Sequence, residues 1–162
     1  MNAQQLTRDS PAEGLYVFQP RGGFRYAMDP ILLVGWALEG GTVHTFLDIG
    51  TGSGLMALLL TRLGLEGRGI DVLPDWVELA QKSARESGLS TPFEVMDARR
   101  LPAAAVDLVV CNPPYFPLAS GSTSPNPMRA AARHECAGTL EDLVAACARS
   151  GRRVCLTLPH AR

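Results

Sequence analysis

"TFLDIGTGSG", residues 45–54, joins a short apolar run to three closely spaced glycines and continues into the helical pattern "SGLMALLLTRLG". An apolar run of this length, bounded by turn residues, is typical of a buried strand. Glycines in such a turn let the backbone approach a ligand closely, and the N–H groups of the following helix point at the same place. The stretch therefore predicts a strand, a ligand-binding loop and a helix in succession.

The same alternation continues along the rest of the chain. It is preceded by a helix over about 30–39, for which Asp29 stands at the N-cap position and Pro30 at the first helical position. Strand-helix alternation indicates parallel pairing with right-handed crossovers and helices on both faces. We therefore expect an α/β fold with a Rossmann-like open parallel sheet of five strands over residues 45–50, 67–72, 92–98, 106–111 and 152–158, with helices over 53–64, 74–88 and 139–151. A further short strand over 15–20 precedes them.

Length and composition indicate one ordinary domain. The chain has 162 residues, of which 46% are hydrophobic and 19% charged, with a formal net charge of -1, so bulk charge identifies no partner. We expect residues 1–14 to be a flexible N-terminus and residues 15–162 to form the domain.

The four cysteines are too widely spaced for a zinc site, and we expect buried thiols and no metal. Apolar runs are too short to span a membrane, which favours a cytoplasmic protein.

Three strand ends carry carboxylates beside or after the glycine loop. In an open parallel sheet the ligand crevice lies beyond the carboxyl ends of the strands. Asp48 precedes the loop, Asp71 is placed to accept both hydroxyls of a ribose, and Asp97 can meet the edge of an adenine ring. The glycine spacing departs from the dinucleotide fingerprint because Leu55 stands where its third glycine belongs. A plain tight turn, a solvated strand-end carboxylate and a turn-forming aspartate remain open as alternatives.

A fourth strand end is the most informative: "VVCNPPYF", residues 109–116. The side-chain oxygen of Asn112 and the carbonyl of Pro113 can accept the two N–H hydrogens of a planar amine. This would stabilise the positive charge that develops on its nitrogen. The prolines stiffen the turn, and Tyr115 and Phe116 can stack on a base. A rigid Pro-Pro turn with a capping asparagine is the alternative.

Together "DIGTGSG", "GIDV", "VMDA" and "NPPY" resemble the successive motifs of class I S-adenosylmethionine-dependent methyltransferases, in the amino-methylating branch marked by NPPY. The resemblance covers roughly residues 15–158. Within that branch, "FRYAMDPILLVGWA" and "PMRAAARHE" are similar to the tRNA(Val) adenine-N6-methyltransferase family, whose members methylate an adenine beside the anticodon. The resemblance implies S-adenosyl-L-methionine as the cofactor, tRNA as the partner and an exocyclic adenine amino group as the methyl acceptor.

The resemblance also implies roles for individual residues. Asp48 and the glycine loop would bind the methionine part of the cofactor, Asp71 the ribose and Asp97 the adenine. An N-terminal segment that contains Tyr26 would close over the cofactor. The predicted cofactor-binding residues are Arg25, Asp29, Asp48, Gly50, Thr51, Gly52, Gly54, Asp71, Val72, Asp97, Ala98 and Asn112. The predicted catalytic residues are Asn112, Pro113, Pro114 and Tyr115, and those for substrate binding are Tyr115, Phe116, Arg129, Arg133 and His134. Arg133 and His134 are equally well explained as ordinary polar residues that lead into a helix.

The chain departs from that family at its end, "LTLPHAR". Such enzymes continue past the fifth strand into a helix and a β-hairpin, whereas here the sheet is expected to stop after strand five without the C-terminal hairpin. An exposed edge strand is a template for pairing with another chain. We therefore expect either a truncated chain or a homo-oligomer or partner that covers this edge.

Two other functions compete with methylation of a tRNA adenine. A protein-glutamine N-methyltransferase uses the same clamp on a side-chain amide. A catalytically silent methyltransferase-fold binding module would keep the fold to contact RNA or a partner. A nicotinamide oxidoreductase is disfavoured by the glycine spacing.

Overall fold

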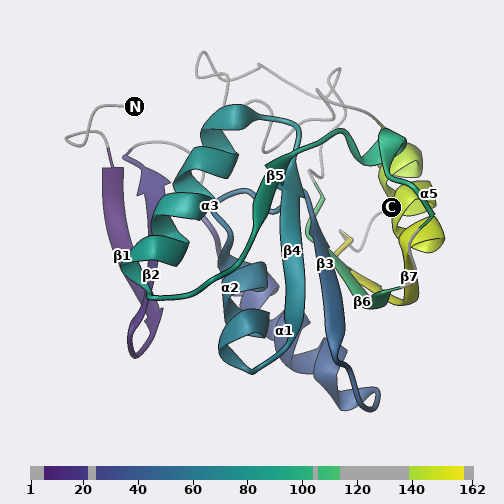
Figure 1. The fold of residues 1–162 in the computed structure, drawn as a ribbon, viewed down its shortest axis with the longest axis horizontal. Helices are drawn as coiled ribbons and strands as arrows, with labels where there is room; N and C mark the ends of the chain where they lie inside the picture. The colour runs from purple at the N-terminus through teal and green to yellow at the C-terminus, as the bar shows by residue number, and fades with distance from the viewer. Residues whose placement is uncertain (1–5, 22–24, 104–105, 114–138, 159–162) are drawn as a thin grey trace.

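The computed structural model describes residues 6–21, 25–103, 106–113 and 139–158. Its centre is a five-stranded parallel sheet with the strand order β5-β4-β3-β6-β7 (Figure 1). The chain fills the sheet outward from β3 in one direction and then restarts from β6 in the other, as in a doubly wound fold. The expected Rossmann-like α/β fold is confirmed. The strands are β3 (Thr45–Ile49), β4 (Glu66–Asp71), β5 (Phe93–Val95), β6 (Val106–Cys111) and β7 (Gly151–Leu156).

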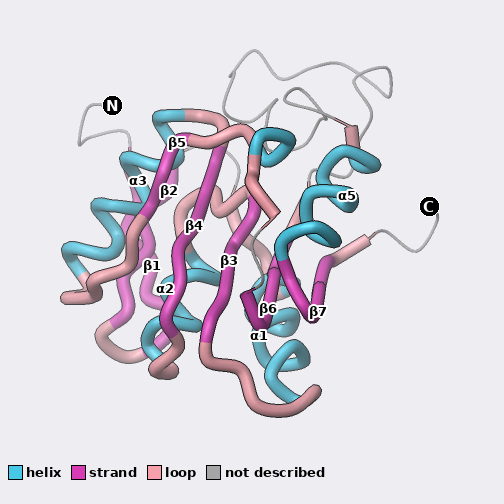
Figure 2. Tube along the Cα trace, turned by 45° about the vertical axis from the view of Figure 1, so that its right-hand side comes forward, coloured by secondary structure: helices cyan, strands magenta, loops and turns pink. Residues whose placement is uncertain are grey.

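Helices cover both faces of this sheet. One face packs against α1 (Asp29–Glu39), α2 (Leu55–Arg62) and α3 (Pro74–Glu86), and the other against α5 (Leu140–Ser150) and the short 3-10 helix η2 (Ala98–Arg100). Figure 2 shows α1 and α5 on opposite sides of β6 and β7.

The alternation of side chains along each strand explains the two apolar layers. In β6, Leu108 and Val110 belong to the layer under α1 and α2, and Val109 and Cys111 belong to the layer under α5. Because successive strand residues point to opposite faces, a strand buried on both sides must be apolar throughout. This is why the buried half of β6 is a continuous apolar run, "LVVC", whereas β4, "EGRGID", has its polar residues where it is exposed or half-buried.

The chain forms a β-hairpin near its N-terminus, where a flexible segment was predicted. Residues 1–14 were expected to be flexible, but β1 (Leu6–Ala12) pairs antiparallel with β2 (Leu15–Pro20). The hairpin lies beside α3, at the far end of the molecule from α5 (Figure 1). The backbone N–H groups of Tyr16 and Phe18 donate to the hydroxyls of Ser87 and Ser83 on α3, at 2.8 and 3.0 Å. Strand β2 is thereby held on α3, and its other edge provides the template on which β1 forms.

The first helix holds a second correction. The apolar run "ILLVGWAL" predicts that Trp36 and Leu32 lie in the core, as Trp76 does, but 64% and 63% of their surfaces are exposed, against 4% for Trp76. The buried face of α1 is formed by Pro30, Leu33, Val34 and Ala37. Trp36 lies on the other side of the helix, although its neighbours in the sequence are apolar too.

Helix α5 begins with a capping box, which the spacing of Thr139 and Asp142 in the sequence predicts. The Thr139 hydroxyl accepts from the Asp142 N–H at 3.2 Å and the Asp142 carboxylate accepts from the Thr139 N–H at 3.0 Å. Three of the four cysteines, Cys111, Cys147 and Cys155, are buried free thiols, while Cys136 lies outside the described residues. Over the described ranges, no cluster of side chains suits a metal ion. No helix in the described part of the chain has the length and apolar character needed to cross a membrane.

Candidate active site at the carboxyl edge of the sheet

The register of the three central strands brings the predicted site residues together. Ile49 of β3 lies opposite Ile70 of β4 and Cys111 of β6. The residues that follow, Gly50, Asp71 and Asn112, therefore leave the sheet side by side. The register continues across β7, since the Thr157 N–H donates to the carbonyl of Cys111 at 3.3 Å.

The glycine loop presents its backbone to open space. Gly50 and Gly52 have φ values of 71° and 54°, and a Cβ atom added to either would meet no heavy atom within 4 Å. Residues with side chains rarely adopt this backbone conformation, so glycine is the natural residue at both positions. The loop leads directly into α2, whose first N–H groups have no partner within the helix. This combination is suited to a ligand with polar or anionic groups.

Asp48 lies beneath this loop and is completely buried. Its Oδ2 accepts hydrogen bonds from the Thr51 hydroxyl at 2.7 Å and the Ala57 N–H at 3.1 Å. Its Oδ1 is buried with no hydrogen-bond partner among the described residues. Burial, opposed in part by those two donors, raises the pKa of Asp48 to about 7. A carboxylate with an unsatisfied oxygen is costly, and a cationic donor at this place would relieve that cost.

Asp71 joins the end of β4 to the glycine loop. Its Oδ2 accepts from the Gly52 N–H at 2.9 Å and its Oδ1 from the Leu73 N–H at 3.0 Å. Burial raises the pKa of Asp71, and these backbone donors oppose the rise. A carboxylate offers about four lone-pair positions, so these two bonds do not use its full capacity as an acceptor. Val72, the next predicted residue, is 36% exposed.

Asp97 has the local role that the sequence left open as an alternative. It caps η2 by accepting from the Arg99 N–H at 2.9 Å, and its Oδ2 lies 2.6 Å from the Arg99 guanidinium. The side-chain hydrogen bond from Arg99 lowers the pKa of Asp97 to about 2. Ala98 is buried beside it. A contact of this pair with adenine stays a prediction.

The clamp predicted after β6 is described for its first two residues. Asn112 is half-buried and Pro113 is buried. The Asn112 Oδ1 accepts a hydrogen bond from the Thr157 hydroxyl at 2.5 Å. Thr157 was missed in the sequence, although it directly follows β7 as Asn112 directly follows β6. The remaining predicted residues, Pro114, Tyr115, Phe116, Arg129, Arg133 and His134, lie outside the described residues.

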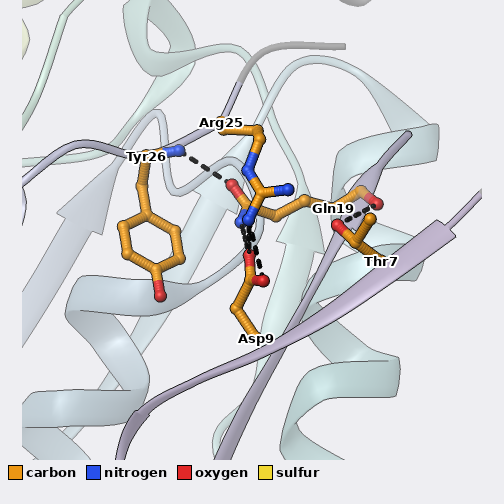
Figure 3. A network of polar contacts seen from close by, with 5 residues as sticks. All are labelled: Thr7, Asp9, Gln19, Arg25 and Tyr26. Carbon is orange, nitrogen blue, oxygen red and sulfur yellow. Dashed lines mark hydrogen bonds and ion pairs between the residues drawn. The ribbon is translucent and has the colours of Figure 1, made fainter. Parts of the chain in front are cut away.

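The N-terminal segment is tied to the hairpin, as Figure 3 shows. The Arg25 guanidinium pairs with the Asp9 carboxylate at 2.8 Å, and the Tyr26 N–H donates to the Gln19 side-chain oxygen at 2.8 Å. Gln19 is only 2% exposed and its amide also donates to Asp9. Closure of Arg25 over a cofactor stays a prediction.

Asp29, the other predicted residue of this segment, stands at the start of α1. It lines a hollow of about 640 Å³ together with Leu32, Leu33, Trp36 and the end of β7, residues 156–158. Thr157 belongs to the wall of this hollow, so Asp29 lies near the clamp end of the site rather than on the hairpin.

The residues present fit S-adenosylmethionine. The ligand has an ammonium that can meet a buried carboxylate, a carboxylate that suits a helix N-terminus and a ribose that suits a strand-end acid. The structure offers the unsatisfied Oδ1 of Asp48, the open backbone at Gly50 and Gly52, and Asp71 beside them. These features lie at the carboxyl ends of the adjacent strands β3 and β4, and β3 borders the point between β3 and β6 where the strand order reverses, which is where such folds bind ligands.

Comparison with known proteins agrees with this geometry. The family model described as a methyltransferase domain matches residues 46–140. The chain resembles the Pyrococcus abyssi tRNA (uracil-54, C5)-methyltransferase, solved with S-adenosyl-L-homocysteine, with a TM-score of 0.59 at 20% identity over 68% of this chain and 28% of that one, a likeness of fold. The fold and the site thus define a class I S-adenosylmethionine-dependent methyltransferase.

Similar curated proteins identify the family within this class of methyltransferases. The tRNA1(Val) (adenine(37)-N6)-methyltransferase of Aeromonas salmonicida is 37% identical over 90% of this chain and 64% of its own length. That of Mannheimia succiniciproducens is 30% identical over 99% of this chain and 69% of its own. The chain belongs to this family, and its cofactor is S-adenosyl-L-methionine. It spans about two thirds of the length of these relatives. A release factor glutamine methyltransferase of Rhodospirillum rubrum is 42% identical over 56% of this chain and 29% of its own length.

The role of Asp71 leads to a first prediction. Asp71→Asn should weaken S-adenosylmethionine binding by about 10- to 100-fold, because a hydrogen bond to a charged acceptor is worth roughly 1.5–3 kcal/mol. Titration calorimetry measures this directly. Asp75→Asn is the matched control, since Asp75 is an exposed carboxylate in the first turn of α3 and loses the same charge. Equal affinities of the two variants would contradict a ribose contact by Asp71.

Proposed function

We propose that this chain transfers a methyl group from S-adenosylmethionine to the exocyclic amino group of an adenine in tRNA. The observation that carries the proposal is the position of Asn112. Its amide leaves the sheet next to Gly50, at the strand end adjacent to the predicted cofactor loop. The curated relatives named above, which act on an adenine of tRNA1(Val) by their names, support the choice of acceptor.

The chemistry divides between the cofactor and the chain. When bound, the cofactor supplies an electrophilic methyl carbon on a sulfonium. An adenine amine is a poor nucleophile, because its nitrogen lone pair is delocalised into the ring. The Asn112 side-chain oxygen and the Pro113 carbonyl are acceptors for its two N–H groups. They favour the tetrahedral, positively charged nitrogen of the transition state over the planar ground state.

Preorganisation gives these acceptors their effect. Pro113 is buried, its ring fixes φ, and Pro114 after it in the sequence restricts ψ, so the Pro113 carbonyl has little freedom to reorient when charge appears. Asn112 is held by the hydrogen bond from Thr157. No strong general base is required, since the alkylated nitrogen is acidic and its proton leaves readily.

A second candidate is methylation of a glutamine side chain in a protein. It is favoured by the 42% identity with a release factor glutamine methyltransferase, although that match covers 95 residues. A glutamine amide also carries a planar NH₂ group, so the clamp alone does not distinguish the two acceptors.

One experiment separates the candidates. The protein is incubated with methyl-labelled S-adenosylmethionine and either total tRNA or a purified release factor, and the labelled tRNA is digested to nucleosides for mass spectrometry. We expect label in tRNA as N6-methyladenosine. Label confined to the release factor would replace the proposed function by glutamine methylation. Cofactor binding without label in either substrate would indicate a silent binding module.

A further inference from the structure

We propose that Thr157 is a positioning residue for methyl transfer, which orients the Asn112 amide toward the substrate amine. The inference rests on the proposed function. It assigns a role to a residue that the motif-based prediction did not include. Thr157 lies just beyond β7, two strands away from the glycine loop, and follows the strand that neighbours β6.

The contact that carries the inference is short and specific. The Thr157 hydroxyl donates to Oδ1 of Asn112 at 2.5 Å, between residues 45 positions apart in the chain. This Oδ1 is the atom that the proposed mechanism uses as an acceptor. An amide oxygen can accept two hydrogen bonds. Thr157 supplies one of these bonds and thereby restricts rotation of the amide about its terminal side-chain torsion, which is otherwise broad.

The orientation of the amide matters because its two ends have opposite functions. The oxygen accepts from the N–H groups of an amine, whereas the NH₂ end would repel them. An amide that turned over would place a donor against a donor, and the transition state would lose its acceptor. A second hydrogen bond that holds the plane in place therefore contributes to preorganisation.

The backbone of Thr157 is fixed independently of its side chain. Its N–H donates to the Cys111 carbonyl at 3.3 Å, which extends the β6–β7 ladder by one residue. Cys111 immediately precedes Asn112, so the same ladder fixes both partners. A change to the Thr157 side chain should leave this backbone bond intact while it removes the hydrogen bond to the amide.

The test is a set of substitutions at Thr157. In Thr157→Val, which keeps the shape and removes the hydroxyl, kcat for tRNA methylation should fall about tenfold. The expected size corresponds to one hydrogen bond of about 1.4 kcal/mol. The KM values for both substrates should stay within about twofold, because the hydroxyl is not proposed to bind either. Thr157→Ser restores a hydroxyl and should recover most of the activity. Thr157→Ala provides a second hydroxyl-free variant should the valine protein fail to fold.

A double-mutant cycle separates positioning from general structural loss. If Thr157 acts through Asn112, adding Thr157→Val to Asn112→Ala should change kcat by less than about twofold. Thr91→Val is the matched control, because it removes a hydroxyl bonded to Thr61 at 3.0 Å and is not part of the site. Its kcat should equal that of the wild type.

A readout other than activity tests the contact itself. In ¹⁵N-labelled protein with S-adenosylmethionine bound, the side-chain amide resonances of Asn112 should shift in Thr157→Val and return in Thr157→Ser. Those resonances are assigned by their loss in Asn112→Ala. The positioning role would be overturned if the Asn112 amide resonances did not shift, or if Thr157→Val lowered kcat equally in the wild type and in Asn112→Ala. Either result would leave tRNA methylation established. A wild-type protein that labels no tRNA would overturn the proposed function and the inference with it.

Discussion

Asn112→Ala should lower kcat for methyl transfer by about 100- to 1,000-fold, the loss typical of removing one preorganised dipole from a transition state. The Asn112 residue that the variant changes is half-buried, and the oxygen that is lost accepts a hydrogen bond from the Thr157 hydroxyl. Cofactor binding should weaken by less than about tenfold, since Asp48, Asp71 and the glycine loop remain. Single-turnover methylation at saturating cofactor gives the rate, and calorimetry gives the affinity.

Gln81→Ala is the matched control for loss of an amide. Gln81 lies on α3, where its side chain donates to the Phe93 carbonyl at 3.2 Å. It should retain wild-type kcat. The clamp would be contradicted if Asn112→Ala kept its rate at saturating cofactor and lost only cofactor affinity. In that case Asn112 would serve the cofactor rather than the methyl acceptor.

The part of the fold that the sequence predicts is the part buried on both faces. Strands β3 and β6 are predicted because strands buried on both faces are largely apolar, and β4 is predicted from its place between a helical pattern that ends at Gly64 and one that begins at Pro74. Parallel strands have their carboxyl ends at one edge of the sheet. The sequence therefore predicts that Asp48, Asp71 and Asn112 lie near one another.

The part that the sequence misses depends on contacts between distant residues. Strand β1, "LTRDSPA", is polar and contains a proline, and it forms because β2 is already held on α3 by Ser83 and Ser87. Trp36 lies in the apolar run "ILLVGWAL", which has no polar face to show which side of α1 is buried. Thr157 acquires its contact with Asn112 only through the pairing of β6 with β7.

The affinity for S-adenosylmethionine should rise steeply with pH, by up to about 100-fold between pH 5 and pH 7–8. The pKa of Asp48 is about 7 in the free protein because the carboxyl is completely buried. At pH 5 only about 1% of such a carboxyl is ionised. The resemblance assigns the methionine part of the cofactor to Asp48 and the glycine loop. If the ammonium of that part pairs with the Asp48 carboxylate, only the ionised form binds well. The α-amino group of the ligand, with an ordinary pKa of about 7.7–8.0, stays protonated over most of this range.

In the free protein, a rise in pH has the opposite effect: it lowers the free energy of unfolding. Folding raises the pKa of Asp48 from 3.8 to about 7, so the folded state binds the proton more tightly than the unfolded state. The stability contributed by the protonated carboxyl is complete below about pH 4 and is lost as the pH rises to 7. The free energy of unfolding falls by about 4 kcal/mol in this range, because each pKa unit corresponds to about 1.4 kcal/mol. Bound cofactor should therefore raise the melting temperature more at pH 7 than at pH 5.

Calorimetry in buffers of different ionisation enthalpy measures how many protons are released on cofactor binding, and this number tests the role of Asp48. Binding at pH 6 should release close to one proton per cofactor, because Asp48 is about 90% protonated before binding and ionised afterwards. Asp48→Asn removes the titrating group, so its affinity should be low and flat over this range. Tighter binding at pH 5 than at pH 7, or no proton release by the wild type at pH 6, would show that the buried carboxyl stays neutral under the cofactor. The unsatisfied Oδ1 would then need a different partner, such as an ordered water, and the ammonium of the cofactor would have to be held elsewhere on the glycine loop.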